Sequence, residues 1–184
     1  MTTIKDLFTA EIKDLYSAEK QLIKALPKMV AGANDPELKA GLKAHLEETK
    51  EQAARLERIA EMLGTKASGK LCKGMEGLVA EGSEALSEDG TPAVLDLGII
   101  GAACRVEHYE MAGYMCAIAL AEQLGHTEAV NLLNESLAEE NSAEGSLREK
   151  ATALMNEAGD GDGAPESSTQ STKKSGMKAM AGKA

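Results

Sequence analysis

The fold is decided by residues 4–29, IKDLFTAEIKDLYSAEKQLIKALPKM, in which large apolar residues recur at spacings of three and four. This spacing places them along one side of an α-helix. A helix is therefore predicted over residues 3–32. Its apolar stripe consists of Ile4, Phe8, Ile12, Leu15, Leu22, Leu26 and Met29.

The residues that follow, GANDP at positions 32–36, predict a tight turn. Asp35 is a suitable N-cap, and Pro36 suits the first position of a second helix that runs to about residue 63. Because the connection is so short, this helix must return antiparallel to the first. A second hairpin is predicted to begin at the cap Thr91-Pro92 and to turn at Gly125-His126.

A long connection, residues 64–90, joins the two hairpins and contains a short amphipathic segment. Such a crossover is typical of ferritin-like bundles, because it lets the second and third helices run parallel. The sequence therefore predicts an all-α fold, a ferritin-like antiparallel four-helix bundle of two αα-hairpins whose long crossover carries a short extra helix. A solenoid of two repeats is the alternative, and it is disfavoured because solenoids usually need at least three repeats.

The predicted organisation is a bundle over residues 1–158 and a disordered tail over residues 159–184, which is rich in Gly, Ser and Lys. The chain has 184 residues, of which 43% are hydrophobic and only 2% are aromatic, as expected for closely packed helices. Its net charge of −10 argues against a nucleic-acid binder, whose affinity depends on neutralising phosphates.

No apolar stretch is long enough to span a membrane, and the charged N-terminus does not resemble a signal peptide. The three cysteines show neither a disulfide framework nor zinc-binding spacing. A cytoplasmic protein is expected.

Each long helix becomes polar at mid-length. Glu19 interrupts the stripe of the first helix between Leu15 and Leu22. The other three helices are interrupted at His45, Glu48 and Gln52, at Glu107 and Glu110, and at Glu140.

These interruptions lie at matching depths when residues are counted from the predicted turns. Glu19 and Glu48 are about equally far from the first turn, and Glu110 and Glu140 from the second. The two hairpins thus present similar carboxylate pairs at one level of the bundle. The count carries an error of about one helical turn, so that it does not distinguish Glu107 from Glu110.

Carboxylates inside a bundle are costly unless protons, basic side chains or metal ions neutralise them. Basic residues are scarce at matching positions, and two divalent cations would balance four glutamates. Oxygen-rich ligation suits iron or manganese, so the sequence predicts a mid-bundle site for two such ions. The alternative is that these glutamates lie at solvated helix edges by chance.

Five segments closely resemble the bacterial ferritin-like stress proteins of the YciE/YciF type. They are LYSAEKQLIKALPKM (15–29), HLEETKEQAARLE (45–57), LCKGMEGLVAEG (71–82), RVEHYEMAGY (105–114) and LAEEN (137–141). The resemblance implies a ferritin-like fold, a homodimer and a role in bacterial stress responses. It also implies metal ligands at Glu19, His45, Glu48, Glu107, Glu110 and Glu140.

One departure from standard di-iron proteins is visible in the sequence. Those proteins carry Glu-x-x-His on two helices, a motif that this chain lacks. His45-x-x-Glu48 reverses the order, and Ala143 stands where a histidine would follow Glu140. A complete ferroxidase centre is therefore not expected, and one ion, or two weakly bound ions, is compatible with this ligand set.

The leading functional hypothesis is a stress protein whose iron or manganese site acts on oxygen or peroxide as a small oxidant substrate. The alternative is a non-enzymatic dimeric interaction protein whose metal site is vestigial or empty. The apolar stripe between Leu71 and Leu86 is the predicted dimer contact, because it is expected to be exposed.

Overall fold

The computed structural model describes residues 1–159 and contains five helices in that range. They are α1 (Ile4–Gly32), α2 (Pro36–Met62), α3 (Lys73–Ala85), α4 (Pro92–Gln123) and α5 (Thr127–Gly159). The disordered tail predicted over residues 159–184 lies outside the described residues, except for Gly159, which ends α5.

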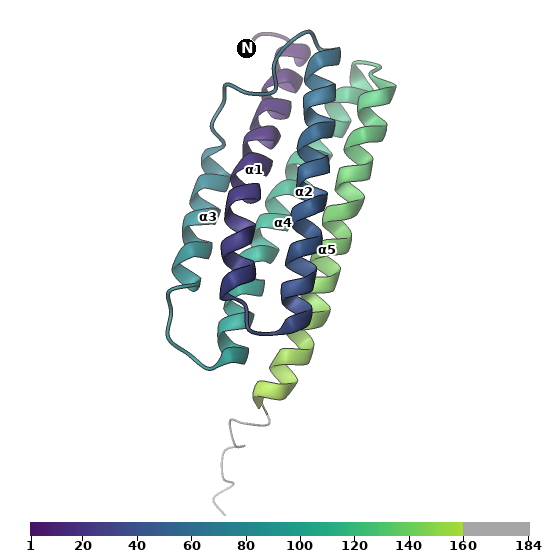
Figure 1. Cartoon of the computed structure of the whole chain (residues 1–184). Helices are drawn as coiled ribbons and strands as arrows, with labels where there is room; N and C mark the ends of the chain where they lie inside the picture. The colour runs from purple at the N-terminus through teal and green to yellow at the C-terminus, as the bar shows by residue number, and fades with distance from the viewer. Residues whose placement is uncertain (160–184) are drawn as a thin grey trace, which may run out of the picture.

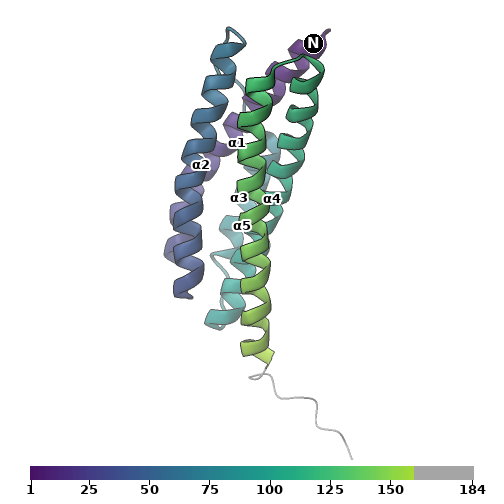
Figure 2. The same ribbon diagram turned by 90° about the vertical axis from the view of Figure 1, so that its right-hand side faces the viewer.

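The four long helices form a bundle. In it α1 packs against α2 and α4, and α5 packs against the same two helices from the other side (Figure 1). Neighbouring long helices run antiparallel, whereas α2 and α4 run in the same direction (Figure 2). This arrangement confirms the predicted bundle of two hairpins joined by a crossover.

The local signals at the turns explain where the helices begin and end. The Asp35 side chain accepts a hydrogen bond from the amide of Leu38 at 2.8 Å, and Pro36 begins α2, as predicted. Gly125 has a φ of 71°, a conformation that favours glycine, and it reverses the chain between α4 and α5. Thr91 makes no side-chain cap hydrogen bond, so only Pro92 of that predicted start signal contributes.

A buried carboxylate on the second hairpin forms hydrogen bonds with the turn of the first hairpin. Asp96 on α4 accepts hydrogen bonds from the backbone amides of Asn34 and Asp35, each at 2.7 Å, and from the side-chain amide of Asn34 at 3.3 Å. The turn between α1 and α2 thus obtains partners for amides that the helices leave free. The sequence prediction missed this contact.

The short helix α3 lies outside the bundle against α1 and α4 (Figure 1). Met75 is fully buried, and Leu78, Val79 and Leu86 pack against the core of the bundle. The expectation that this stripe is exposed was therefore wrong for these four residues, which cover α1 and α4, whereas Leu71 at the start of the stripe is 48% exposed. The packing of α3 therefore gives no support for a dimer contact at this stripe.

The apolar core consists of two clusters, one at each end of the bundle. The cluster near the α1–α2 turn includes Leu26, Met29 and Ile99, and the cluster near the α4–α5 turn includes Phe8 and Ile59. Between them lies a layer of buried polar side chains: Glu19, His45, Thr49, Gln52, Glu107, Glu110, Ser136 and Glu140. None of the helices within residues 1–159 is long and apolar enough to cross a membrane.

Candidate metal centre

Four carboxyl groups and one imidazole meet inside the bundle at the level of the polar layer. Glu19, Glu110 and Glu140 are 0% exposed, Glu107 is 2% exposed and His45 is 6% exposed. They come from all four long helices, and each stands in line with the apolar stripe of its helix. The structure therefore rejects the alternative of solvated glutamates for these positions.

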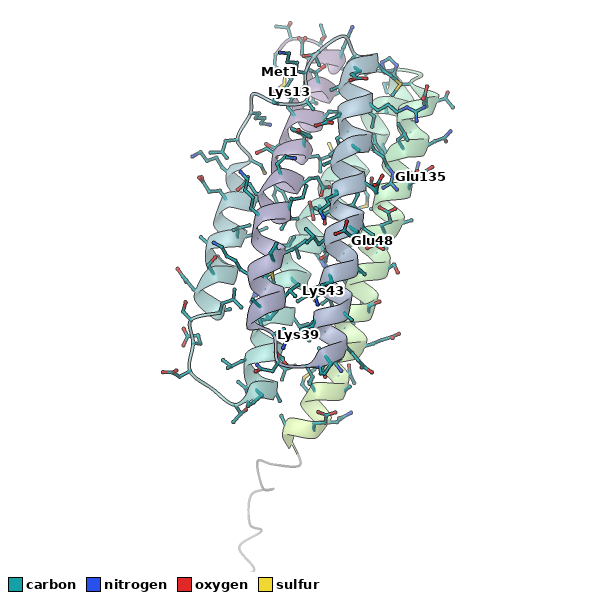
Figure 3. The ribbon with its side chains drawn as sticks, viewed as in Figure 1. Met1, Lys13, Lys39, Lys43, Glu48 and Glu135 are labelled. Carbon is teal, nitrogen blue, oxygen red and sulfur yellow. The ribbon has the colours of Figure 1, made fainter. Side chains whose placement is uncertain are left out.

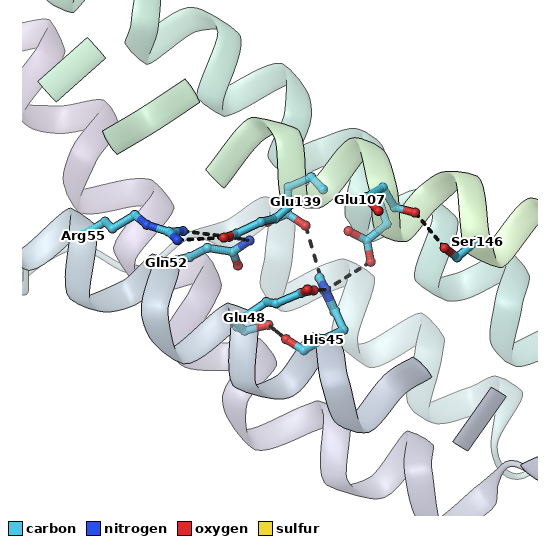
Figure 4. A network of polar contacts seen from close by, with 10 residues as sticks. His45, Glu48, Gln52, Arg55, Glu107, Glu139 and Ser146 are labelled. Atoms are coloured by element: carbon cyan, nitrogen blue, oxygen red, sulfur yellow. Dashed lines mark hydrogen bonds and ion pairs between the residues drawn. The ribbon is translucent and has the colours of Figure 1, made fainter. Parts of the chain in front are cut away.

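Four of these residues form a compact set, which we call the four-residue cluster: His45, Glu107, Glu110 and Glu140. One ligand atom from each lies within 4.8 Å of the others. The imidazole Nε2 of His45 is 3.3 Å from Oε1 of Glu107 and 3.9 Å from Oε2 of Glu140 (Figure 4). Such a set of oxygen and imidazole donors suits a divalent transition metal.

Most of the polar atoms at this level have no hydrogen-bond partner among the described residues. They are Glu19 Oε2, Gln52 Oε1, Glu107 Oε2, both ring nitrogens of His45, and both carboxyl oxygens of Glu110 and of Glu140. Buried polar atoms are nearly always satisfied, and each exception requires an explanation. Metal coordination would satisfy a group of acceptors concentrated at one point, so the residues present fit a metal ion.

The electrostatics also indicate that the site needs cations. Burial, and then repulsion from Glu140, raises the pKa of Glu19 well above its ordinary value. Burial and the neighbouring carboxyls do the same to the pKa of Glu107 and of Glu110. Burial raises the pKa of Glu140 as well, although the adjacent Glu107 carboxyl and the nearby His45 oppose the rise.

Within residues 1–159, only His45 places a basic nitrogen within ion-pair distance of these carboxyls. Arg105 on α4 and Arg148 on α5 are exposed. Protons or metal ions must therefore balance most of the charge in the layer.

Glu19 lies beside the four-residue cluster, and a tyrosine orients it. The hydroxyl of Tyr114 on α4 donates a hydrogen bond to Oε1 of Glu19, and both side chains are fully buried. The sequence prediction missed Tyr114. The available signal was its position four residues after Glu110, on the same face of the helix.

Of the two sequence-predicted ligands outside the four-residue cluster, Glu19 is buried beside it, whereas Glu48 lies at the surface. Its side chain is 46% exposed, and its Oε2 lies 3.6 Å from Nδ1 of His45 (Figure 3). On α2 the inward positions are occupied by Thr49 and Gln52, which are both fully buried. Glu48 thus contacts the outer nitrogen of His45, while Nε2 of His45 faces the acids.

A second polar network supports the layer from the α5 side. Arg55 makes two hydrogen bonds of 2.7 Å to the carboxylate of Glu139, which also accepts a bond of 3.0 Å from Nε2 of Gln52 (Figure 4). This network fixes the amide of Gln52 with its Oε1 free of hydrogen bonds. Gln52 was identified from the sequence, but the ion pair between Arg55 and Glu139 was missed.

A groove between α2 and α5 connects this level of the bundle with solvent. Its volume is about 470 Å³, and its lining includes His45, Glu48 and Glu107. The candidate centre is therefore buried on the side of α1 and α4 and accessible from the side of α2 and α5.

Comparisons with known proteins agree with this fold. A family model described as a domain of unknown function, DUF892, matches residues 3–159. Protein YciF of Escherichia coli K12 is 40% identical over 157 residues, which cover 85% of this chain and 95% of that protein.

Two solved structures are similar as well. The crystal structure of the E. coli stress protein YciF matches with a TM-score of 0.82 and 39% identity, covering 85% of this chain and 99% of that one. YcfI of Rhodopseudomonas palustris, whose description suggests a structural role, matches with a TM-score of 0.78 and 42% identity, covering 80% and 94%.

Proposed function

The chain belongs to the DUF892 family, and on that premise we propose that its polar layer binds two ions of iron or manganese. We propose further that the protein serves in a stress response by acting on oxygen or peroxide. The similarity to the stress protein YciF supports the physiological part of this proposal. A homodimer is part of the same proposal.

The observation that carries the proposal is the group of buried carboxyl oxygens without hydrogen-bond partners. In Glu110 and in Glu140 both carboxyl oxygens lack a hydrogen-bond partner, and both side chains are fully buried. An apolar core normally contains no such group, because an uncompensated buried charge is strongly destabilising. Cations at this position would remove the penalty for all four acids together.

The ligands divide naturally into two sets. His45, Glu107, Glu110 and Glu140 would hold the first ion, since their ligand atoms converge within 4.8 Å. Glu19 would hold the second ion, together with oxygens of Glu110 and Glu140. Besides burial, repulsion from Glu140 raises the pKa of Glu19, and repulsion from Glu19 raises the pKa of Glu110. Four carboxylates and two divalent ions give a neutral layer.

Iron or manganese in such a setting supplies redox and Lewis-acid chemistry toward oxygen or peroxide. The residues of the chain prepare the site for it. Tyr114 holds Glu19 in place, and Glu48, from the outer side of His45, orients the imidazole so that Nε2 faces the acids. The apolar clusters above and below keep bulk water away, and the groove between α2 and α5 admits the oxidant.

The direct test is the metal content of the full chain, purified without added metal and then titrated with Mn(II) or Fe(II) under anaerobic conditions. Two ions per chain, located by anomalous scattering beside Glu110 and Glu140, are expected. The Glu19→Ala, Glu140→Ala double variant should bind neither. An unchanged stoichiometry in that variant would disprove the site, and metal-loaded protein that consumes neither oxygen nor peroxide would disprove the activity.

A second candidate function is a non-enzymatic structural protein. It is favoured by the absence of Glu-x-x-His from the sequence and by the structural role suggested for YcfI. On this hypothesis a chelator leaves the melting temperature unchanged, whereas an ion that binds the native state raises it.

A further inference from the structure

The groove between α2 and α5 is much larger than oxygen or hydrogen peroxide requires. Its volume of about 470 Å³ lies in the range of pockets that hold small organic molecules. It ends at His45 and Glu107, which belong to the four-residue cluster. A molecule in the groove would therefore have one end at the candidate metal centre.

The walls of the groove are mainly apolar. Leu38, Leu42 and Leu147 provide the large apolar surface, and small residues leave the space between the helices. Those small residues are Gly41, Ala44, Ser142, Ala143, Ser146 and Ala153. Such walls bind the apolar body of a ligand through removal of its surface from water.

The charges along the groove disfavour an anion. Glu37, Glu48 and Glu149 line it together with the buried Glu107. Lys150 is the only lysine or arginine among the lining residues, and its Nζ already lies 2.7 Å from Asp35 and 2.9 Å from Glu37. A ligand carboxylate would thus meet several negative charges and a lysine that is already paired.

We propose that this groove binds a small neutral organic molecule with a mostly apolar body and a terminal hydroxyl or hydroperoxyl group. The apolar body lies between α2 and α5, and the terminal oxygen group reaches His45 and Glu107. The inference rests on the proposed function in one respect, since it gives the substrate class of the same centre. The inference goes beyond the proposed function because it also requires a binding site for the apolar body of the molecule.

The test compares three ligands with the same body and different ends: phenylbutanol, phenylbutanoate and phenylbutylamine. Binding to the full chain is followed by isothermal titration and by NMR shifts of the methyl groups of Ala44, Ala143 and Ala153. Phenylbutanol should bind and shift these methyls, and phenylbutanoate should bind at least about tenfold more weakly, a difference of about 1.4 kcal/mol. Tighter binding of the amine or of the carboxylate would overturn the assignment of a neutral ligand.

The variant that tests the place of binding is Gly41→Leu, because Gly41 lines the groove and a Cβ at this position meets no atom within 4 Å. Gly98→Leu on α4 is the matched control, since the space at Gly98 is equally free and Gly98 does not line the groove. The affinity for phenylbutanol should fall by about tenfold or more in Gly41→Leu and stay within about twofold in Gly98→Leu. Equal affinities in the two variants would place the ligand elsewhere and overturn the proposal.

Two further outcomes separate this inference from the proposed function. Gly41→Leu should bind metal as the unaltered chain does, because the change adds volume and leaves every ligand in place. Phenylbutanol binding without any metal binding would refute the metal centre and leave the groove as a ligand site. Binding that weakens as the protein concentration rises would show that a second copy of the chain covers the groove, which would overturn the proposal.

Discussion

The hydroxyl of Tyr114 donates a hydrogen bond to Oε1 of Glu19, which joins α4 to α1 at a point where neither side chain reaches solvent. Tyr114→Phe keeps the ring and removes the donor, so that a buried carboxyl oxygen loses its partner. We expect a loss of about 1–3 kcal/mol in the free energy of unfolding, measured with urea. Tyr16→Phe is the control, because that hydroxyl bonds to Glu57 at the surface, and its loss should change stability by less than about 0.5 kcal/mol.

Glu140→Gln tests the buried acids as metal ligands. The amide has nearly the same shape but carries no charge, so elemental analysis should find less bound metal after equilibration with Mn(II). The metal-free variant should melt at a higher temperature than the metal-free unaltered chain at pH 7, because burial disfavours the charge of Glu140. Glu135→Gln on the same helix is the control, since Glu135 is 61% exposed, and it should change neither quantity by much. Full metal content in Glu140→Gln would contradict the assignment.

The stability of the metal-free chain should fall as the pH rises. Burial lifts the pKa of Glu19, Glu107 and Glu110 well above the ordinary value of 4.5, so the folded chain keeps protons that the unfolded chain has released. Stability is then fully present below about pH 4.5 for these groups and is lost as the pH rises through their folded-state pKa values. Calorimetry in the presence of a chelator should show this decline. Mn(II) should remove it, because the ion takes the place of the protons, and a chelated protein that gains stability between pH 5 and pH 8 would contradict it.

Asp96→Ala tests the link between α4 and the turn of the first hairpin. The change removes the buried carboxylate that accepts hydrogen bonds from the partly buried backbone amides of Asn34 and Asp35. Hydrogen bonds to a charged group contribute about 1.5–3 kcal/mol each, so we expect a loss of about 3 kcal/mol or more in the free energy of unfolding. Asp89→Ala, in the exposed connection before α4, should cost less than about 0.5 kcal/mol. Equal losses of unfolding free energy in the two variants would mean that the Asp96 hydrogen bonds do not stabilise the contact between the hairpins.

Much of this fold could be predicted because its signals are local and repeated. The stripe from Phe8 to Met29 fixes a helix and its buried face, and the Asp35-Pro36 signal fixes the next helix start. The polar level of the bundle was also predictable, since antiparallel residues equally far from a turn lie side by side. Glu107 and Glu110 could not be separated from sequence, and the structure gives the reason: both are buried, on one face of α4.

The predictions were weaker where the rotation of a helix about its axis determines which residues face inward. Counting from a turn gives the depth of a residue, whereas facing inward depends on its angle around the helix axis. His45, Thr49 and Gln52 continue the buried side of α2, and Glu48 lies one position before Thr49, so its side chain points away. Contacts between distant segments, such as Asp96 with Asn34, leave no periodic signal in a single sequence.

The two apolar clusters share no continuous apolar contact through the polar layer, and this bears on the cooperativity of unfolding. In the metal-free chain, we expect each end of the bundle to open with its own cluster, since the polar layer separates the apolar contacts of the two ends. Cations at mid-height would connect all four long helices and make the ends open together. Metal occupancy would then decide whether hydrogen exchange reports two independent units or one, and bound ions would be part of the folding unit.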